Sequence, residues 1–186
     1  PAWRDAQNDD DPHLPIAPDD DAIQLYTSGT TGHPKGVQLS NANYLAFFRA
    51  AQAAKWGDFG AGEANLVAMP NFHVAGTNMG VATLAQGATA IIQREVNPEE
   101  ILDLIARHRI RSAFLVPAVI GMLVQHPKIR EADISSLRSM FYGASPIAEA
   151  LLAQAQATFA GCGFTQLYGL TETVGAATAL QPADHV

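Results

Sequence analysis

Short apolar runs that alternate with helix-forming segments constrain the fold of this 186-residue chain more than any other feature. The runs have the length and composition of strands, and they occupy residues 65–69, 88–92, 112–116, 139–142 and 164–167, the first of them with the pattern of a buried strand. Segments rich in alanine, leucine and other small residues separate them and predict helices, the clearest at residues 77–86, 118–125 and 147–159. Strands that alternate with helices predict an α/β fold, with a mainly parallel sheet and helices on both faces.

Ser40 and Asn97 mark the starts of two further helices. Ser40 is a good N-cap and opens an alanine-rich segment that runs to about residue 55, with Phe47 and Phe48 on its apolar side. Asn97 precedes Pro98 at the first helical position and two acids in the first turn, which is typical of a helix start. The first of these helices is expected to pack on a sheet.

A glycine- and hydroxyl-rich loop, YTSGTTGHPKGV at residues 26–37, follows a predicted buried strand at residues 22–26. Its glycines permit positive φ, so backbone N–H groups can converge on one point, and its hydroxyls and lysine add further donors. Such a set of donors suits a polyphosphate. The residues expected to bind it are Thr27, Ser28, Gly29, Thr30, Thr31, Gly32 and Lys35. The common P-loop is excluded, because the lysine here follows proline and precedes glycine. The alternative interpretation of the whole stretch is a glycine- and threonine-rich surface turn.

A second motif, YGLTET at residues 168–173, follows the last predicted strand. Tyr168 can stack on a purine, and Gly169 lets the backbone approach a ligand closely. Thr171 offers a hydroxyl to a phosphate, and Glu172 offers a hard oxygen ligand to Mg²⁺. The alternative is purely structural, with Thr171 or Thr173 capping a helix.

The two motifs resemble, in the same order, the two signatures of the acyl-adenylate-forming superfamily, which includes acyl-CoA synthetases, adenylation domains of peptide synthetases and luciferases. The resemblance implies ATP-dependent activation of a carboxylic acid to acyl-AMP, followed by transfer to coenzyme A. It implies ATP and Mg²⁺ as cofactors and coenzyme A as co-substrate. It also implies that Thr171 contacts the α-phosphate, that Glu172 binds the metal, and that Lys35 offsets the negative charge of the reacting anions.

Two further segments resemble loops of the same superfamily. Gly143, Ala144 and Ser145 resemble its adenine-binding turn, although an ordinary strand-to-helix loop would look similar. His73, Val74 and Gly76 resemble a loop beside the acyl pocket. Peptide-synthetase adenylation domains tend to carry aspartate there, to pair the amino group of an amino acid. The histidine therefore favours an unaminated acid, such as a fatty or aryl acid.

The four loops follow predicted strands, so they are expected to meet at one edge of the sheet and to form one site. Residues 22–186 then form an incomplete AMP-binding domain, because the superfamily's ribose-binding aspartate and C-terminal lysine would lie downstream of Val186. Residues 1–21 are acidic and proline-containing, which indicates a lead-in or linker. The segment alone is expected to be inactive. The alternatives are nucleotide binding without turnover and a peptide-synthetase adenylation domain.

Composition narrows the partners to small molecules. A net charge of −7 argues against a nucleic-acid partner, and no apolar run is long enough to span a bilayer. The single cysteine, Cys162, cannot form an internal disulfide, which fits a reducing, cytoplasmic setting. Nothing cationic clearly neighbours this cysteine in the sequence, so its expected role is structural.

Overall fold

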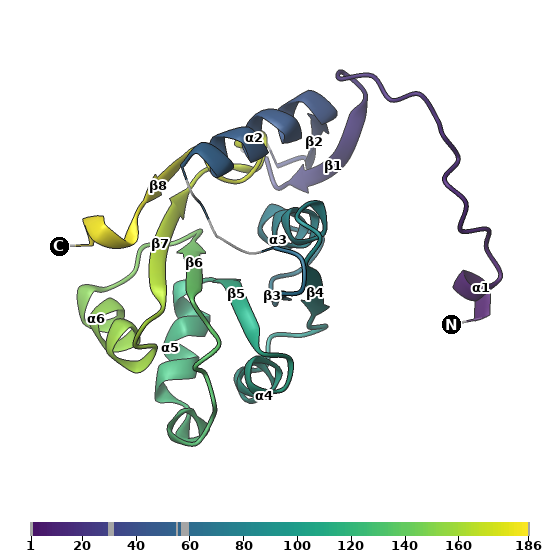
Figure 1. Cartoon of the computed structure of the whole chain (residues 1–186). Helices are drawn as coiled ribbons and strands as arrows, with labels where there is room; N and C mark the ends of the chain where they lie inside the picture. The colour runs from purple at the N-terminus through teal and green to yellow at the C-terminus, as the bar shows by residue number, and fades with distance from the viewer. Residues whose placement is uncertain (1, 30–31, 55, 57–59, 186) are drawn as a thin grey trace.

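The computed structural model describes residues 2–29, 32–54, 56 and 60–185, and these form two sheets (Figure 1). The larger sheet has six strands in the order β4-β3-β5-β6-β7-β8. Its first five strands pair in parallel, and β8 runs antiparallel to β7. The strands are β3 (Ala64–Val67), β4 (Thr89–Ile92), β5 (Ile110–Leu115), β6 (Ser139–Gly143), β7 (Gly163–Tyr168) and β8 (Thr178–Leu180). The mainly parallel α/β fold is therefore confirmed.

Helices cover both faces of this sheet, and alternate residues of β3 show which helix covers which face. Leu66 is fully buried in the main core together with Ile101 and Ile105 of α4. Its neighbour Asn65 points to the other face, where Nδ2 donates to Thr83 Oγ1 of α3 at 3.3 Å. The helices are α3 (Val74–Ala85), α4 (Pro98–His108), α5 (Pro117–Gln125) and α6 (Glu149–Thr158). The last three share the main core.

The smaller sheet is a hairpin of β1 (Asp21–Thr27) and β2 (Lys35–Ser40), which pair antiparallel. The prediction of a buried strand at residues 22–26 is wrong in this respect, since only Leu25 of β1 is buried. The hairpin packs one face on α2 (Asn41–Ala53), and its other face is exposed. A second core joins these elements to α3 and to the β7–β8 loop through Leu25, Leu39, Tyr44, Val74 and Val174.

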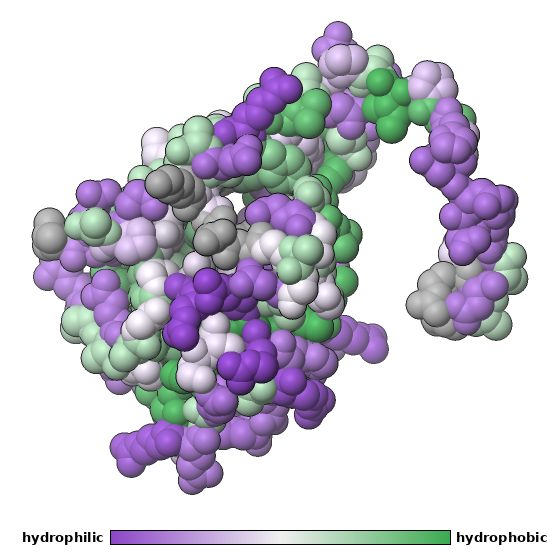
Figure 2. Space-filling model, in the orientation of Figure 1, coloured by the Kyte–Doolittle hydropathy of each residue, from purple (hydrophilic) through white to green (hydrophobic). Residues whose placement is uncertain are grey.

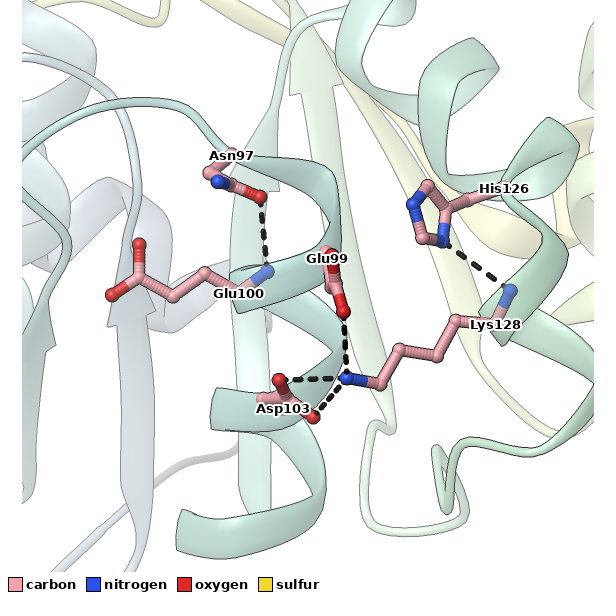
Figure 3. Close-up of polar contacts among 6 residues, drawn as sticks. All are labelled: Asn97, Glu99, Glu100, Asp103, His126 and Lys128. Atoms are coloured by element: carbon pink, nitrogen blue, oxygen red, sulfur yellow. Dashed lines mark hydrogen bonds and ion pairs between the residues drawn. The ribbon is translucent and has the colours of Figure 1, made fainter.

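The predicted helix starts at Ser40 and Asn97 are confirmed. The Asn43 N–H donates to Ser40 Oγ at 3.3 Å, and Asn43 Oδ1 accepts from the Ser40 N–H at 3.0 Å. Asn97 Oδ1 accepts from the Glu100 N–H at 3.1 Å (Figure 3). These bonds satisfy backbone donors that the first turn of each helix leaves free.

An ion-pair cluster ties α4 to the short 3₁₀ helix η1 (Pro127–Arg130), as Figure 3 shows. Lys128 Nζ lies 2.7 Å from Asp103 Oδ1 and 3.3 Å from Glu99 Oε1. The hydrogen bond to Asp103, with a smaller contribution from Glu99, raises the pKa of Lys128. The Lys128 N–H also donates to His126 Nδ1 at 3.3 Å, so His126 caps η1.

The N-terminal segment begins with α1 (Ala2–Asp5) and continues without regular structure to β1, away from the body of the molecule (Figure 1). Its surface is mostly hydrophilic (Figure 2). It is fixed at its end by Asn41, whose Nδ2 donates to Ala17 O and Asp20 O at 3.2 Å each. Across the described residues, no helix combines the length and the apolar character needed to cross a bilayer.

Candidate functional site

A cavity of about 1250 Å³ lies between the hairpin with α2 on one side and the α3-covered face of the large sheet on the other. Six parts of the chain supply its walls: the β1–β2 turn, α2, Trp56 in the segment after α2, α3 with its caps, the ends of β5 to β7, and the β7–β8 loop. The residues predicted for the site that line it are Thr27, Ser28, Gly29, Lys35, His73, Val74, Ala144, Gly169, Thr171 and Glu172. All four predicted loops therefore contribute to one cavity.

The glycine-rich loop is the turn of the hairpin and does not follow a strand of the large sheet, which corrects the expected placement. Thr27 and Lys35 are paired residues at the ends of β1 and β2. Gly29 has φ +64°, and a Cβ there would lie 2.4 Å from His33 O, so only glycine fits without a shift of the backbone. Gly32, with φ +84°, lies off the cavity wall. Thr30 and Thr31 lie outside the described residues.

The β7–β8 loop separates a structural threonine from two side chains that line the cavity. Thr173 Oγ1 accepts from the Leu170 N–H at 2.9 Å and lies 3.0 Å from Leu170 O, so Thr173 stabilises the turn. Thr171 and Glu172 have no side-chain hydrogen bond within the described part of the chain, and both line the cavity. Tyr168 is 69% exposed and lies off the wall.

Asn78 and Tyr44 hold this loop, a role that no local sequence pattern indicates for either residue. Tyr44 on α2 donates from its hydroxyl to Asn78 Oδ1 at 3.0 Å. Asn78 on α3 in turn bonds the backbone of Val174, which follows the Thr171–Thr173 turn. Burial raises the pKa of Tyr44, so this hydroxyl stays protonated as a donor. Only the folded chain brings these three elements together.

His73 has a structural role in addition to its place on the wall. It is the N-cap of α3, and its Nδ1 accepts from the Ala75 N–H at 3.3 Å, which leaves Nε2 available to other groups. Gly76 is buried and lies off the wall. A Cβ there would lie 2.3 Å from Met69 O and Pro70 O, so the backbones approach closely at this point. Gly76 thus lets α3 pack against the end of β3.

The end of β6 brings a strained residue to the cavity. Ala144 has φ 65°, a left-handed conformation that non-glycine residues seldom adopt, and it lines the wall. The preceding Gly143 lies off the wall, where a Cβ would stand 2.2 Å from Leu167 O of the neighbouring strand. Ser145 is exposed and also lies off the wall.

Aromatic and aliphatic side chains form the rest of the cavity. Phe47 of α2 and Trp56 meet edge to face, with ring centroids 6.0 Å apart. Trp56 Nε1 is buried and has no hydrogen-bond partner among the described residues. The apolar residues of the wall include Phe47, Phe48, Trp56, Met79, Phe114, Phe141 and Leu167. Sequence reasoning assigned Phe47 and Phe48 to a helix face but did not place them in the site.

The charged groups of the cavity are few. Lys35 and Glu172 are the only lysine and the only carboxylate among the described residues that line it. No group of three or more His, Cys, Asp or Glu side chains suited to a metal occurs among the described residues. Cys162 lies elsewhere, and burial raises the pKa of its thiol to about 12, which fits a structural role.

Comparison with known proteins finds one family across almost the whole chain. Residues 2–186 match the family described as AMP-binding enzyme. The fatty acid–[acyl-carrier-protein] ligase ScoC of Streptomyces coeruleorubidus is 38% identical, over 100% of this chain and 36% of its own length. The feruloyl-CoA synthase of Amycolatopsis sp is 34% identical, over 96% of this chain and 36% of its own length. The chain thus spans about a third of each relative.

Solved structures agree with the architecture. The inhibitor-bound N-terminal domain of FACL13 from Mycobacterium tuberculosis superposes with a TM-score of 0.84 at 30% identity, covering 98% of this chain and 45% of that one. The O-succinylbenzoate coenzyme A synthetase MenE of Bacillus subtilis, in complex with ATP and magnesium, gives a TM-score of 0.78 at 28% identity, covering 90% of this chain and 34% of that one.

Proposed function

Since the chain belongs to the AMP-binding enzyme family, we propose that it takes part in the ATP-dependent activation of a carboxylic acid to an acyl-adenylate. One observation carries this proposal. The same cavity combines the glycine-rich turn and Lys35 with Thr171 and Glu172, and it continues into an apolar wall. A nucleotide with its phosphates and an apolar acid need these two kinds of surface side by side.

The chemistry requires two anions to meet. A carboxylate oxygen of the acid attacks the α-phosphorus of ATP, which forms acyl-AMP and expels pyrophosphate. Lys35 and the backbone N–H groups of the hairpin turn offset the repulsion and hold the phosphates. In this proposal Thr171 donates its hydroxyl to the α-phosphate, and the hydroxyl is available because it makes no hydrogen bond within the described part of the protein.

The residues present fit a magnesium ion that arrives with the nucleotide. Mg²⁺ commonly takes one or two protein carboxylates and completes its shell with substrate phosphates and water. Glu172 is the only carboxylate among the described residues of the wall, and it has no hydrogen-bond partner among them. When bound, the ion would neutralise charge on the phosphates.

The acyl group is proposed to be an unaminated, apolar acid, of which a fatty acid is the simplest. The apolar wall of Phe47, Trp56 and Phe114 suits a hydrocarbon, and His73 lines the cavity where an amino acid would need a carboxylate. A peptide-synthetase role is disfavoured for that reason. The relatives named above act on a fatty acid and on ferulate, so chain and ring substrates both belong in the test.

The second half-reaction is proposed to transfer the acyl group to the thiol of coenzyme A. ScoC is a ligase for acyl-carrier protein, so the carrier-bound thiol is the competing acceptor. Because the chain spans only 36% of each relative, nucleotide binding without turnover is the second candidate for the chain by itself.

Pyrophosphate exchange into ATP tests the proposal. It is measured with fatty, aryl and α-amino acids, on the 186-residue chain and on any longer product of the same gene. We expect exchange with unaminated acids in the longer product. Exchange with an α-amino acid but not with its deaminated analogue would contradict the substrate class. If both proteins bind the nucleotide and neither catalyses exchange, the adenylation proposal fails and nucleotide binding without turnover remains.

A further inference from the structure

A second cavity, of about 520 Å³, opens at the edge of the large sheet where β3, β5 and β6 begin. These strands are neighbours in the sheet, so the segments that precede them meet there. The cavity described above lies where the same strands end. The two are therefore separated by the length of a strand, roughly 20 Å for six residues. We call the second one the amino-edge cavity.

Cationic side chains dominate the amino-edge cavity. Four arginines and one histidine line it, against a single carboxylate, in a chain whose net charge is −7. The residues are Arg107, His108, Arg109, Arg111 and Arg138, with Glu63 as the carboxylate. Guanidinium groups gathered in one hollow repel one another unless anions lie between them.

Protein groups neutralise part of this charge. Arg111 Nε lies 3.3 Å from Glu63 Oε1, and Arg109 Nη1 lies 4.0 Å from Asp133 Oδ2. Arg107 stands in the last turn of α4, where the helix dipole favours a cation. Arg107 and Arg138 form no ion pair within the described ranges of the chain. Two guanidinium groups of this cavity are therefore left without a carboxylate partner among the described residues.

The charge of Arg111 in this cavity is only partly compensated. The Nε–H of Arg111 is buried, and it has no hydrogen-bond partner among the described residues in spite of the nearby Glu63. The 3.3 Å contact with Glu63 is therefore an ion pair without hydrogen-bond geometry, and it compensates the charge of Arg111 less fully than a paired hydrogen bond would.

We propose that the amino-edge cavity binds a small multivalent anion that carries phosphate groups. Guanidinium forks match phosphate oxygens through paired, charge-assisted hydrogen bonds. Arg107 and Arg138 supply charge without an ion-pair partner, and Arg111 adds a guanidinium that Glu63 compensates only in part. The volume of about 520 Å³ suits a small molecule. The site is independent of the proposed adenylation site, because it shares no wall residue with it.

The test is a titration of the ¹⁵N-labelled 19.7 kDa chain with inorganic phosphate and pyrophosphate at fixed ionic strength. The readout is the Nε–H resonance of Arg111, which burial shields from exchange with water. We expect a saturable shift of this resonance, tighter for pyrophosphate. The double variant Arg107→Gln/Arg138→Gln should raise the dissociation constant for pyrophosphate by roughly tenfold, since two charge-assisted contacts are lost.

Controls separate this site from bulk charge and from the adenylation site. Arg94→Gln/Arg130→Gln removes two exposed arginines outside the cavity and should change the dissociation constant less than twofold. Lys35→Ala should leave the Arg111 response intact, whatever becomes of ATP binding. No saturable shift, or equal weakening in both double variants, would overturn the proposal. A response of equal strength to citrate would overturn the assignment to phosphate.

Discussion

Asn78 on α3 donates from Nδ2 to the backbone carbonyl of Val174 at 2.6 Å, across 96 residues of sequence. Val174 has φ 55°, a left-handed conformation that is rare for a β-branched residue. The strained residue directly follows the turn that carries Thr171 and Glu172. The surrounding structure must therefore hold Val174 in place, and Asn78 is the side chain that does so.

Asn78→Ala should destabilise the protein by about 1–3 kcal/mol, because it leaves the Val174 carbonyl and the Tyr44 hydroxyl without partners. Tyr44→Phe is the matched control, since it removes only the bond between Tyr44 and Asn78. Urea unfolding measures the stability, and hydrogen exchange at the Gly175 amide reports on the turn. Faster exchange is expected in Asn78→Ala only. Equal exchange in both variants would show that Asn78 does not position the turn.

Gly76 and Gly80 lie on the same helix and should respond to alanine in opposite ways. A Cβ at Gly76 would lie 2.3 Å from Met69 O, so Gly76→Ala should destabilise by about 1–3 kcal/mol or more. At Gly80 no atom lies within 4 Å of the added Cβ, and Gly80→Ala should stabilise by up to about 1 kcal/mol. Chemical denaturation compares the two. Equal effects of the same sign would contradict this account of the packing of α3.

Lys35→Ala should weaken ATP binding by roughly tenfold to a hundredfold, the range for loss of one hydrogen bond to a charged group. The unfolding midpoint should not change, since Lys35 is exposed at the start of β2. Calorimetry on the folded variant measures the affinity. Arg94→Ala, which also removes one exposed cation but lies outside the cavity, is the control. If Lys35→Ala binds ATP with unchanged affinity, the hairpin turn does not bind the phosphates through Lys35.

Glu172→Gln keeps the size of the side chain and removes its charge. In the protein that shows exchange activity, the rate should fall by roughly two to three orders of magnitude, the range for loss of one such stabilising group. Binding of ATP without metal should change little. Glu149→Gln, at an exposed position in the first turn of α6, should leave both quantities unchanged. Full activity of Glu172→Gln with the same Mg²⁺ requirement would exclude Glu172 as the metal ligand.

Cys162 should resist alkylation in the folded protein. Burial raises the pKa of the thiol from 9.0 to about 12, so its thiolate fraction at pH 8 is lower than in the unfolded chain by roughly a thousandfold. The raised pKa also makes the free energy of unfolding fall between pH 9 and 12, where only the unfolded thiol ionises. Mass spectrometry after iodoacetamide treatment measures labelling with and without urea. Native labelling within tenfold of the unfolded rate would contradict the raised pKa of this partly buried thiol.

Local patterns were sufficient to predict the strands of the parallel sheet and the helix caps. The apolar runs form strands, and those inside the sheet, such as β5, are largely buried, whereas β4 at its edge leaves Ile92 exposed. Ser40 and Asn97 cap helices through bonds to residues three positions away. Such contacts depend on neighbours in the sequence. The short strand β8 was missed because its pairing with β7 defines it, and no pattern in its three residues does.

For the candidate site, too, local patterns identify residues but do not predict which distant segments meet. The hydroxyls and charges of Lys35, Thr171 and Glu172 were found from their motifs, and the structure brings them into one cavity. The hairpin was mistaken for part of the large sheet because a sequence run does not state which strand will be its partner. Asn78 was missed because its importance comes from Val174, a residue that only folding brings near.

The separation of the two cores has a consequence for how this cavity can change over evolutionary time. Phe47 and Phe48 pack in the smaller core, and no residue of α2 belongs to the core of the large sheet. Replacements on α2 can therefore reshape the apolar wall of the cavity while the sheet, and with it the end of β6 that carries Ala144, keeps its packing. Under the proposed function, a library confined to α2 would vary the wall offered to the acid without altering the core of the large sheet.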